Sequence, residues 1–479
     1  MPVTGQLLPG VRQLPTGYDV ANSCRFETNT YMTKSATSGN TKTFTISFWV
    51  KRTDLGAVPS GSNQFPISFY QDSNNRVSFA FTTDNTFVVY AGVSGSTKLY
   101  FVTNRVFRDI SAWMHFVIKV DTTQSTEANR FKLYINGVEE TSFSTATYPS
   151  QNDDLIVNTN IYVGVYDTTN NFYHGYLTEV VYIDGTALDQ SSFGQFDSDS
   201  PNIWKPIDVS GLTFGTNGFY LDFEDSSNLG NDANGGTDLT EYNLATTDQS
   251  TDTCTNNFAT INSLDYNLTS FSEGNLKLNW SQAPNNFGLT TGTIGITSGK
   301  WYWEAKITSP DNSTGIGLGV IQVEPYLSRE TATGVDPSLF YGLGARFTTA
   351  KSINKTSNNV DSSISDTWTN DVIIRIAYDG DAGKIYMWKG TTELNGQTFS
   401  SSTSFNNATL TAEILVLPFV SLGDGGSGTK TSQVEFNFGG TQSFTISSGN
   451  SDGNGYGNFE YSVPSGYYSL NTKNLAEFG

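Results

Sequence analysis

The chain has 479 residues, more than one β-sandwich usually needs, so two core-forming domains are expected. Aromatic residues make up 13% and charged residues only 15%, and much of the remainder is Ser, Thr, Asn and Gly, a mixture that predicts an all-β protein. The net charge of −20, with no basic stripe, excludes proteins that hold nucleic acid by neutralising its phosphates.

Cysteine and histidine are scarce. Cys24 and Cys254 are too few for a disulfide framework, and we expect both to be unpaired, although a single bridge stays open. His115 and His174 are too few for a histidine-rich metal centre. The first residues lack the basic and apolar regions of a signal peptide, and no apolar run could span a bilayer, so neither standard secretion nor membrane insertion is expected.

Residues 1–23 are interrupted by proline and glycine and cannot bury a core alone. Apolar side chains are nevertheless frequent in this segment, as in extended arms that dock on a neighbouring subunit. A frayed terminus is the alternative. The contacts of such an assembly arm would come from Leu7, Leu8, Pro9, Val11, Leu14 and Tyr18.

Residues 24–206 are predicted to form the first domain. Apolar and polar residues alternate with a period of two in several segments, as expected of half-buried strands. The clearest of these segments are Phe44–Val50, Arg76–Phe81, Thr86–Tyr90 and Phe131–Ile135. Asn136-Gly137 follows the last one and suits a type I′ hairpin turn. The pattern predicts a closed antiparallel sandwich.

Four segments of this domain occur in an order that resembles the laminin-G-like, concanavalin A-like lectin/glucanase superfamily. They are Phe44–Arg52 (FTISFWVKR), Trp113–Val117, Phe131–Glu139 (FKLYINGVE) and Gly175–Leu188 (GYLTEVVYIDGTAL). The resemblance implies a jelly roll of two packed sheets. It does not by itself imply sugar binding, because the fold hosts lectins, hydrolases and scaffolding modules.

The same resemblance makes Ca²⁺ the most plausible cofactor, since such domains can hold it with loop oxygens. Suitable loop positions are occupied by Asp72, Asp153, Asp154 and Asp167. No spacing selects one set of ligands, so no metal site is assigned.

Residues 207–266 are predicted to be a connector with one strand, Gly218–Phe223, that pairs back on the first domain. The rest should run over the surface between the domains. Within it, Asp252–Leu264 (DTCTNNFATINSL) resembles connectors in structural proteins of marine tailed bacteriophages, and the ending Ser469–Leu475 (SLNTKNL) resembles the same group.

Residues 267–479 are predicted to form a second, different sandwich. Its landmarks are Gly299–Ile307 (GKWYWEAKI), the alternating glycines of Gly315–Ile321 (GIGLGVI) and Leu417–Leu422 (LPFVSL), an order that resembles the SPRY family. That family binds peptide or protein epitopes through its loops, and the resemblance makes Trp303 a core residue. The three alternating glycines are expected to serve close backbone packing.

No catalytic constellation is found. Glu179 and Asp184 have an odd spacing that predicts opposite faces of a strand, and Asp222 and Glu224 share a face but lack a third carboxylate partner. His115 and His174 have no nucleophile elbow nearby and are interpreted as structural. We therefore expect a protein without enzymatic activity.

These features together predict a non-enzymatic surface protein of a tailed-bacteriophage virion, either a tail fibre or receptor-binding protein or a head-decoration protein. Its expected partners are other capsid or tail proteins, held through the N-terminal region, and a host surface glycan or protein; a homotrimer is favoured. Candidate binding-loop residues are Tyr148, Phe172, Tyr173, Tyr326 and Tyr341. The alternatives are a carbohydrate-binding or carbohydrate-degrading protein of the lectin/glucanase fold, and a SPRY-type peptide-binding adaptor.

Overall fold

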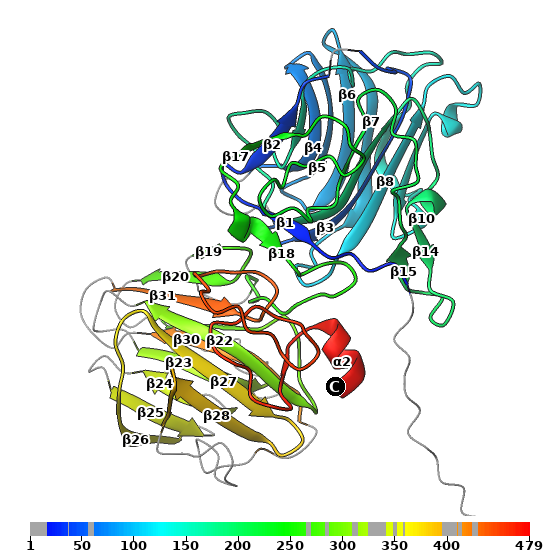
Figure 1. Cartoon of the computed structure of the whole chain (residues 1–479). Helices are drawn as coiled ribbons and strands as arrows, with labels where there is room; N and C mark the ends of the chain where they lie inside the picture. Colours follow the sequence, from blue (N-terminus) through cyan, green and yellow to red (C-terminus); the bar gives the residue numbers. More distant parts are fainter. Residues whose placement is uncertain are drawn as a thin grey trace, which may run out of the picture.

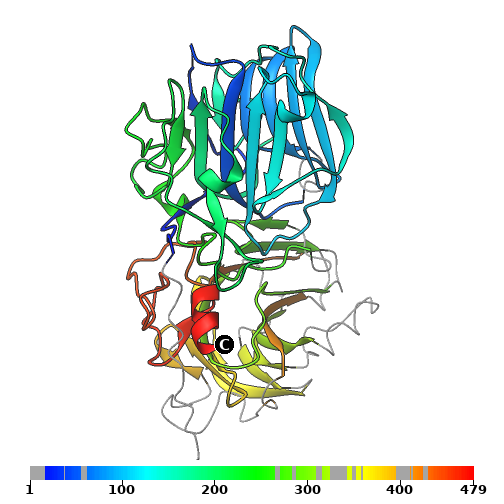
Figure 2. The ribbon, with the colours of Figure 1, turned by 90° about the vertical axis from the view of Figure 1, so that its right-hand side faces the viewer.

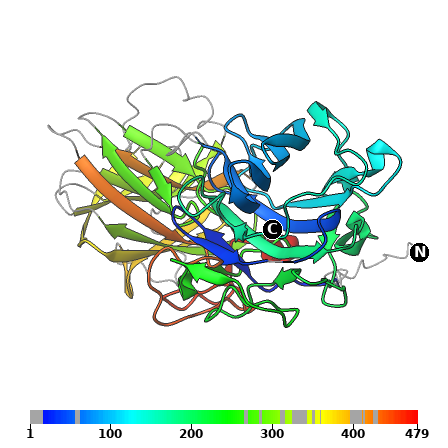
Figure 3. The ribbon, with the colours of Figure 1, turned by 90° about the horizontal axis from the view of Figure 1, so that it is seen from above.

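The computed structural model shows two β-sandwiches, one stacked on the other (Figures 1 and 2). Seen from above, the second sandwich extends to one side beneath the first (Figure 3). The described residues are 17–36, 38–55, 62–264, 270–282, 287–308, 315–323, 342–347, 352–357, 360–394, 410, 414–423 and 430–479. In this part of the chain no helix is long and apolar enough to cross a membrane.

The first sandwich consists of two antiparallel sheets. Sheet A has the strand order β10 (Val138–Glu139), β9 (Phe131–Ile135), β8 (Met114–Asp121), β3 (Thr43–Arg52), β13 (Gly175–Asp184), β1 (Ser23–Phe26) and β18 (Gln249–Ser250), with β16 (Phe219–Leu221) also paired to β13. Sheet B has the order β11 (Phe143–Thr147), β7 (Ser96–Val106), β6 (Thr86–Val93), β5 (Asn75–Phe81), β4 (Gln64–Asp72), β12 (Ile161–Val163), β2 (Tyr31–Lys34) and β17 (Thr240–Tyr242).

Alternation along these strands builds the first core. In β3, the side chains of Phe44, Ile46, Phe48 and Val50 enter one buried cluster, which also contains inward-pointing residues of sheet B such as Val77, Phe79 and Phe81. Phe116 lies at its centre and stacks on Phe48 at 5.6 Å between ring centroids. The core is therefore the layer between sheets A and B, as expected of a two-sheet sandwich.

The first sandwich continues past the expected boundary at residue 206. The predicted connector strand does pair back, as β16 on β13, but it ends at Leu221 because Phe223 has a positive φ of 60°. Beyond it, β17 pairs with β2 and β18 pairs with β1. The sheets of the first domain thus extend to Ser250, and only the segment that follows runs between the two sandwiches.

The second sandwich also has two sheets. One has the order β19 (Ser270–Ser272), β20 (Lys277–Gln282), β31 (Lys430–Asn437), β22 (Lys300–Thr308), β27 (Val372–Asp379), β28 (Lys384–Lys389) and β29 (Thr392–Glu393), with β32 (Tyr468–Ser469) parallel to β22. The other has the order β21 (Phe287–Thr291), β30 (Val416–Gly423), β23 (Gly315–Gln322), β24 (Gly342–Phe347), β25 (Ser352–Ser357) and β26 (Val360–Thr367).

The sequence landmarks of the second domain lie where they were predicted to lie. Trp301 and Trp303 point into the main core, and Tyr302, between them, joins a cluster on the opposite face. In β23, a Cβ on Gly317 would lie 2.3 Å from Ser421 Oγ, and one on Gly319 would lie 2.2 Å from Leu343 O. These glycines therefore permit close strand packing.

Smaller elements complete the chain. A hairpin of β14 (Gly194–Phe196) and β15 (Trp204–Pro206) lies against sheet A, and a short helix, α2 (Thr472–Phe478), ends the chain beside the domain junction (Figure 1). Among the described residues, the 3₁₀ turns are η1 (Glu127–Asn129), η2 (Gln190–Ser192) and η3 (Thr246–Asp248). The prediction of an all-β protein with two successive antiparallel sandwiches is confirmed.

Candidate functional site: a tyrosine face on the first domain

The two outer faces of the first sandwich differ in how they are covered. The outer face of sheet A is buried in part by the loop that follows β13, since Phe193, Val209 and Phe214 pack on Val181 and Ile183. Another part, around Trp49, is covered by Trp113 and Trp204. Little of this face is left for a ligand.

The outer face of sheet B carries aromatic rings instead. Core residues such as Met32, Val89 and Leu99 point inward, so their neighbours Tyr31, Tyr90 and Tyr100 point outward. We call the following set the tyrosine face: Tyr31, Tyr70, Tyr90, Tyr100, Tyr162, Tyr166, Phe172 and Tyr242. Strand register places Tyr90 opposite Tyr100 and Tyr31 opposite Tyr242.

The rings of this face contact one another in three groups, one of which is Tyr70 and Tyr166, edge to face at 5.1 Å between ring centroids. At one end, Tyr242 is 41% exposed and stacks on Tyr31 with a centroid distance of 4.5 Å, and Phe172 lies 6.3 Å from Tyr31. At the other, Tyr90 and Tyr100 meet edge to face at 5.8 Å, and the Arg76 guanidinium lies 4.8 Å from the Tyr90 ring. Such contacts fix ring orientation before any ligand arrives.

Burial keeps three hydroxyl groups of this face protonated at neutral pH, those of Tyr31, Tyr162 and Tyr166. Burial raises the pKa of Tyr166 to about 12, although the nearby Arg76 cation opposes the shift. Burial also raises the pKa of Tyr31 and of Tyr162. The face therefore offers apolar rings with neutral hydroxyls that can donate or accept hydrogen bonds. Rings of this kind can stack on the C–H face of a sugar while their hydroxyls bind its hydroxyl groups.

Of the predicted binding-loop residues that the structure describes, Phe172 alone lies on the tyrosine face. Tyr148 packs against the core at the far edge, 4.8 Å from Phe101. Tyr173 is completely buried and donates a hydrogen bond to Lys51 O at 2.8 Å, so it has no surface for a ligand. Tyr326 and Tyr341 lie outside the described residues.

Most of the predicted assembly arm also lies outside them, namely Leu7, Leu8, Pro9, Val11 and Leu14. Tyr18 is described, and its hydroxyl lies 3.0 Å from that of Tyr220 and 3.4 Å from Glu179 Oε2. The segment at the base of the arm is therefore attached to the outer side of β13 and β16.

His115 lies beside a serine, yet the pair is not arranged for catalysis. The indole N–H of Trp204 donates to His115 Nδ1 at 2.9 Å, so the ring proton of the neutral histidine must be on Nε2. Nε2 lies 2.8 Å from Ser47 Oγ and donates to it, whereas a general base would have to accept the serine proton. Burial lowers the pKa of His115 to about 3, which keeps the ring neutral.

The other acid–base candidates are also held by structural contacts. His174 hydrogen-bonds Thr28 at 3.2 Å, and its Nδ1 lies 3.7 Å from Asp54. The prediction from odd spacing that Glu179 and Asp184 lie on opposite faces does not apply, because a β-bulge between Thr178 and Val181 interrupts the alternation. Asp184 instead accepts hydrogen bonds from two backbone N–H groups. They belong to Asn40, in the loop before β3, and Asn217, in the loop before β16.

The acids considered for Ca²⁺ are occupied by turns. Asp72 accepts from Asn74 N and Asn75 Nδ2, and Asp167 accepts from Thr169. Asp153 pairs with Lys98 at 3.1 Å, and Asp154 accepts from the Thr41 hydroxyl. Among the described residues, no three His, Cys, Asp or Glu side chains gather as metal ligands. Cys24 and Cys254 are unpaired, as expected.

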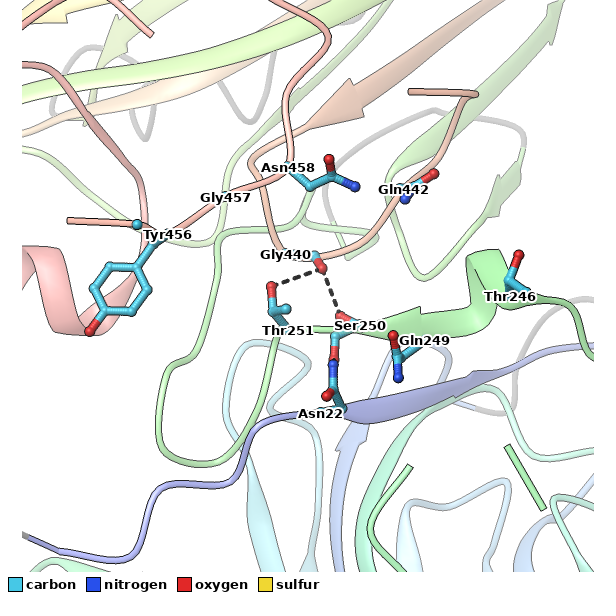
Figure 4. A pocket seen from close by; sticks show the side chains of 11 residues that line it. Asn22, Thr246, Gln249, Ser250, Thr251, Gly440, Gln442, Tyr456, Gly457 and Asn458 are labelled. Carbon is cyan, nitrogen blue, oxygen red and sulfur yellow. Dashed lines mark hydrogen bonds between the residues drawn. The ribbon is translucent and has the colours of Figure 1, made fainter. Parts of the chain in front are cut away.

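A polar cavity of about 180 Å³ lies at the junction of the two sandwiches (Figure 4). Asn22, Gln249 and Ser250 line it from the first domain, and Gln442 and Asn458 line it from the second. Much of this wall is already engaged, since Ser250 and Thr251 both donate to Gly440 O, and Gln249 Nε2 donates to Phe223 O. We therefore interpret the cavity as part of the domain interface.

Residues 26–192 match the Concanavalin A-like lectin/glucanases superfamily, in agreement with the resemblance seen in the sequence. No curated protein matches the chain. Several solved structures are similar in part. A heptameric SAP-like pentraxin from Limulus polyphemus is 15% identical, with 36% of this chain and 80% of that chain covered and a TM-score of 0.27.

The SPRY domain of human HERC1 is 16% identical over 35% of this chain and 90% of its own, with a TM-score of 0.24. Domain 4 of an extracellular arabinanase from Geobacillus stearothermophilus, solved with arabinotriose, is 19% identical over 32% of this chain and 65% of its own, with a TM-score of 0.23. The first domain is thus concanavalin A-like, and SPRY domains are among the structural neighbours.

Proposed function

We propose that this chain is a non-enzymatic carbohydrate-binding protein that holds a glycan on the tyrosine face of its first domain. The observation that carries the proposal is the contrast between the two outer faces. Sheet A is covered, whereas sheet B presents the exposed ring of Tyr242 stacked on the buried ring of Tyr31, and half-buried rings beside them. The half-buried rings are Tyr70, Tyr90, Tyr100, Tyr166 and Phe172. The face is broad, so it suits an extended or branched glycan better than a single small molecule.

Glycan-array binding by the full chain, followed by titration of the best ligand, tests the proposal. Tyr242→Ala is expected to weaken binding about tenfold, because it removes the most exposed ring of the face and unstacks Tyr31. Phe196→Ala is the matched control, since Phe196 is 43% exposed but lies on β14, which packs on sheet A. Absence of any bound glycan, or equal losses in the two variants, would contradict it.

We propose further that the protein is displayed on the surface of a tailed-bacteriophage virion, where the N-terminal arm joins it to capsid or tail proteins and a homotrimer presents three glycan sites. Support for this location comes from the sequence, in the resemblance of residues 252–264 and 469–475 to phage structural proteins. Electron microscopy of particles labelled with an antibody against the chain should reveal its position and copy number. Light scattering of the purified protein should give three times 52.2 kDa for a trimer.

A further inference from the structure

A lysine, an asparagine and an aspartate meet at the centre of the domain junction. Lys51 projects from β3 and has no exposed surface. Its Nζ lies 2.7 Å from Asp252 Oδ2 and 2.7 Å from Asn257 Oδ1, and it also donates to Phe258 O at 3.1 Å. Asp252 is 1% exposed, so the pair is removed from water.

The amide of Asn257 is held in one orientation. Its Nδ2 donates to Ser111 O at 2.7 Å, which leaves Oδ1 facing the Lys51 amine. Because a C=O bond is about 1.23 Å long, the amide carbon lies within about 4 Å of Nζ. An amine, an amide carbon and a carboxyl group thus lie close together, and attack requires Nζ to move toward the carbon to about 3–3.5 Å.

The carboxyl group of Asp252 is placed to take a proton from the Lys51 amine. Asp252 Oδ1 accepts from Trp113 Nε1 at 3.0 Å, and the Tyr176 ring lies 5.9 Å from Lys51 Nζ. Buried charges of opposite sign can neutralise one another by proton transfer, here along the 2.7 Å hydrogen bond. That transfer leaves a neutral lysine amine, which is a nucleophile, and a protonated Asp252, which is a general acid.

We propose that Lys51 and Asn257 form an intramolecular isopeptide bond, with Asp252 transferring the protons. Nζ attacks Cγ of Asn257, so the Nζ–Cγ bond forms and the Cγ–Nδ2 bond breaks. Of the three protons on the Lys51 ammonium, one passes to Asp252, one leaves with Nδ2 as ammonia, and one stays on the new amide. Asn257 is half-buried and its Nδ2 faces the loop at Ser111, so the ammonia would leave on that side.

The bond would tie β3 of the first domain covalently to the segment between the sandwiches. Residues 51 and 257 are far apart in sequence, so the link would close a long loop and restrict the unfolded chain. The non-covalent alternative is a buried ion pair with the same contacts. The two alternatives differ in mass.

Intact-mass measurement of the wild-type chain decides between them without any variant. The proposal predicts a mass lower than the sequence mass by about 17 Da, the ammonia that is lost. Tandem mass spectrometry of a digest should find the Lys51 peptide joined to the Asn257 peptide. An unmodified mass after prolonged incubation of the folded protein overturns the proposal, and so does a link from Lys51 to Asp252 with loss of water.

Variants identify the reacting groups. Lys51→Arg and Asn257→Ala should each restore the sequence mass, and Asp252→Asn should leave most molecules unlinked. Lys34→Arg is the matched control, because Lys34 is also paired with a buried aspartate, Asp232 at 3.2 Å, and its other hydrogen bond is to Gly218 O. The mass of the Lys34→Arg variant should still be lower than its sequence mass by one ammonia. A Lys34→Arg variant with its full sequence mass would contradict the assignment to Lys51.

Discussion

Replacing Arg25 by methionine is expected to lower the free energy of unfolding by about 3–5 kcal/mol, because it removes the cation from a buried network of charges. Arg25 is 5% exposed. It donates twice to Asp248 Oδ1, at 2.9 and 3.1 Å, and lies 2.7 Å from Glu273 Oε2. Its Nη1 also donates to Gln442 O at 3.0 Å. Chemical denaturation followed by tryptophan fluorescence measures the loss.

The same variant should change how the chain unfolds. Arg25 lies on β1 of the first domain, and its partner Asp248 lies in η3. Its other partners, Glu273 and Gln442, belong to the second domain. The guanidinium group therefore joins β1, η3 and the second domain. We expect the two domains of the wild type to unfold together in one transition, and those of the variant to unfold in two separate transitions. Lys132→Met is the control, since its surface pair with Glu139 should be worth no more than about 1 kcal/mol. Equal effects of the two substitutions would show that the Arg25 contacts do not couple the domains.

Glu179→Gln is expected to remove a large pH dependence of stability. Glu179 is 5% exposed, and both of its oxygens lie 2.9 Å from the Tyr220 hydroxyl. Burial raises its pKa from 4.5 to about 8, with the charge of Asp222 adding to the shift and the tyrosine hydrogen bonds opposing it. The folded protein therefore holds a proton that the unfolded chain releases above pH 4.5.

The sign follows from this difference. The contribution of Glu179 is fully present below pH 4.5 and is lost as the pH rises toward 8, with a total of up to about 5 kcal/mol. Because glutamine stays neutral, the variant should be more stable than the wild type at pH 9 and similar to it at pH 4. Thermal melts from pH 4 to 9 measure the difference.

Glu460→Gln provides a comparison of opposite sign. Hydrogen bonds from Ser447 lower the pKa of Glu460, so its stabilisation is present at neutral pH and is lost in acid. If the stability of the wild type and that of Glu179→Gln change with pH in parallel, burial does not hold the Glu179 carboxyl group neutral.

The sequence predicted the long strands well because their alternation is strong. The segment Phe44–Val50 lies within β3, and Asn136-Gly137 forms the expected turn, with φ values of 48° and 78°. The resemblance to the SPRY family implied that Trp303 is a core residue, and Trp303 does lie in the core of the second sandwich. In each case a local pattern in the chain contains the information.

Short or irregular elements escaped prediction. The strands β17 and β18 have three and two residues, too few for alternation to appear, so the end of the first domain was placed too early. The bulge beside Glu179 shifts the register of β13 without any glycine or proline to signal it. Tyr173 was predicted to be a binding residue of a loop. It follows Phe172 directly but points the other way, into the core.

The tyrosine face could have been found only in part. Alternation within β6 and β7 places Tyr90 and Tyr100 on the face opposite Val89 and Leu99. Their alignment with Tyr31 and Tyr242 depends on strand order, because β17 joins the sheet from more than 200 residues away in sequence. Long-range pairing of this kind leaves no trace in local composition.

The pairing of β1 with β18 and the ion pair between Asp19 and Lys473 determine when, during synthesis, the N-terminal part of the chain can complete its contacts. Strand β1 must wait until residues 249–250 have been synthesised before its edge is covered, and Asp19 must wait for Lys473. These contacts can form only after residue 473 has been translated. A product truncated before residue 249 would therefore expose one edge of β1. The exposed edge would make this product a better substrate for proteases than the folded chain.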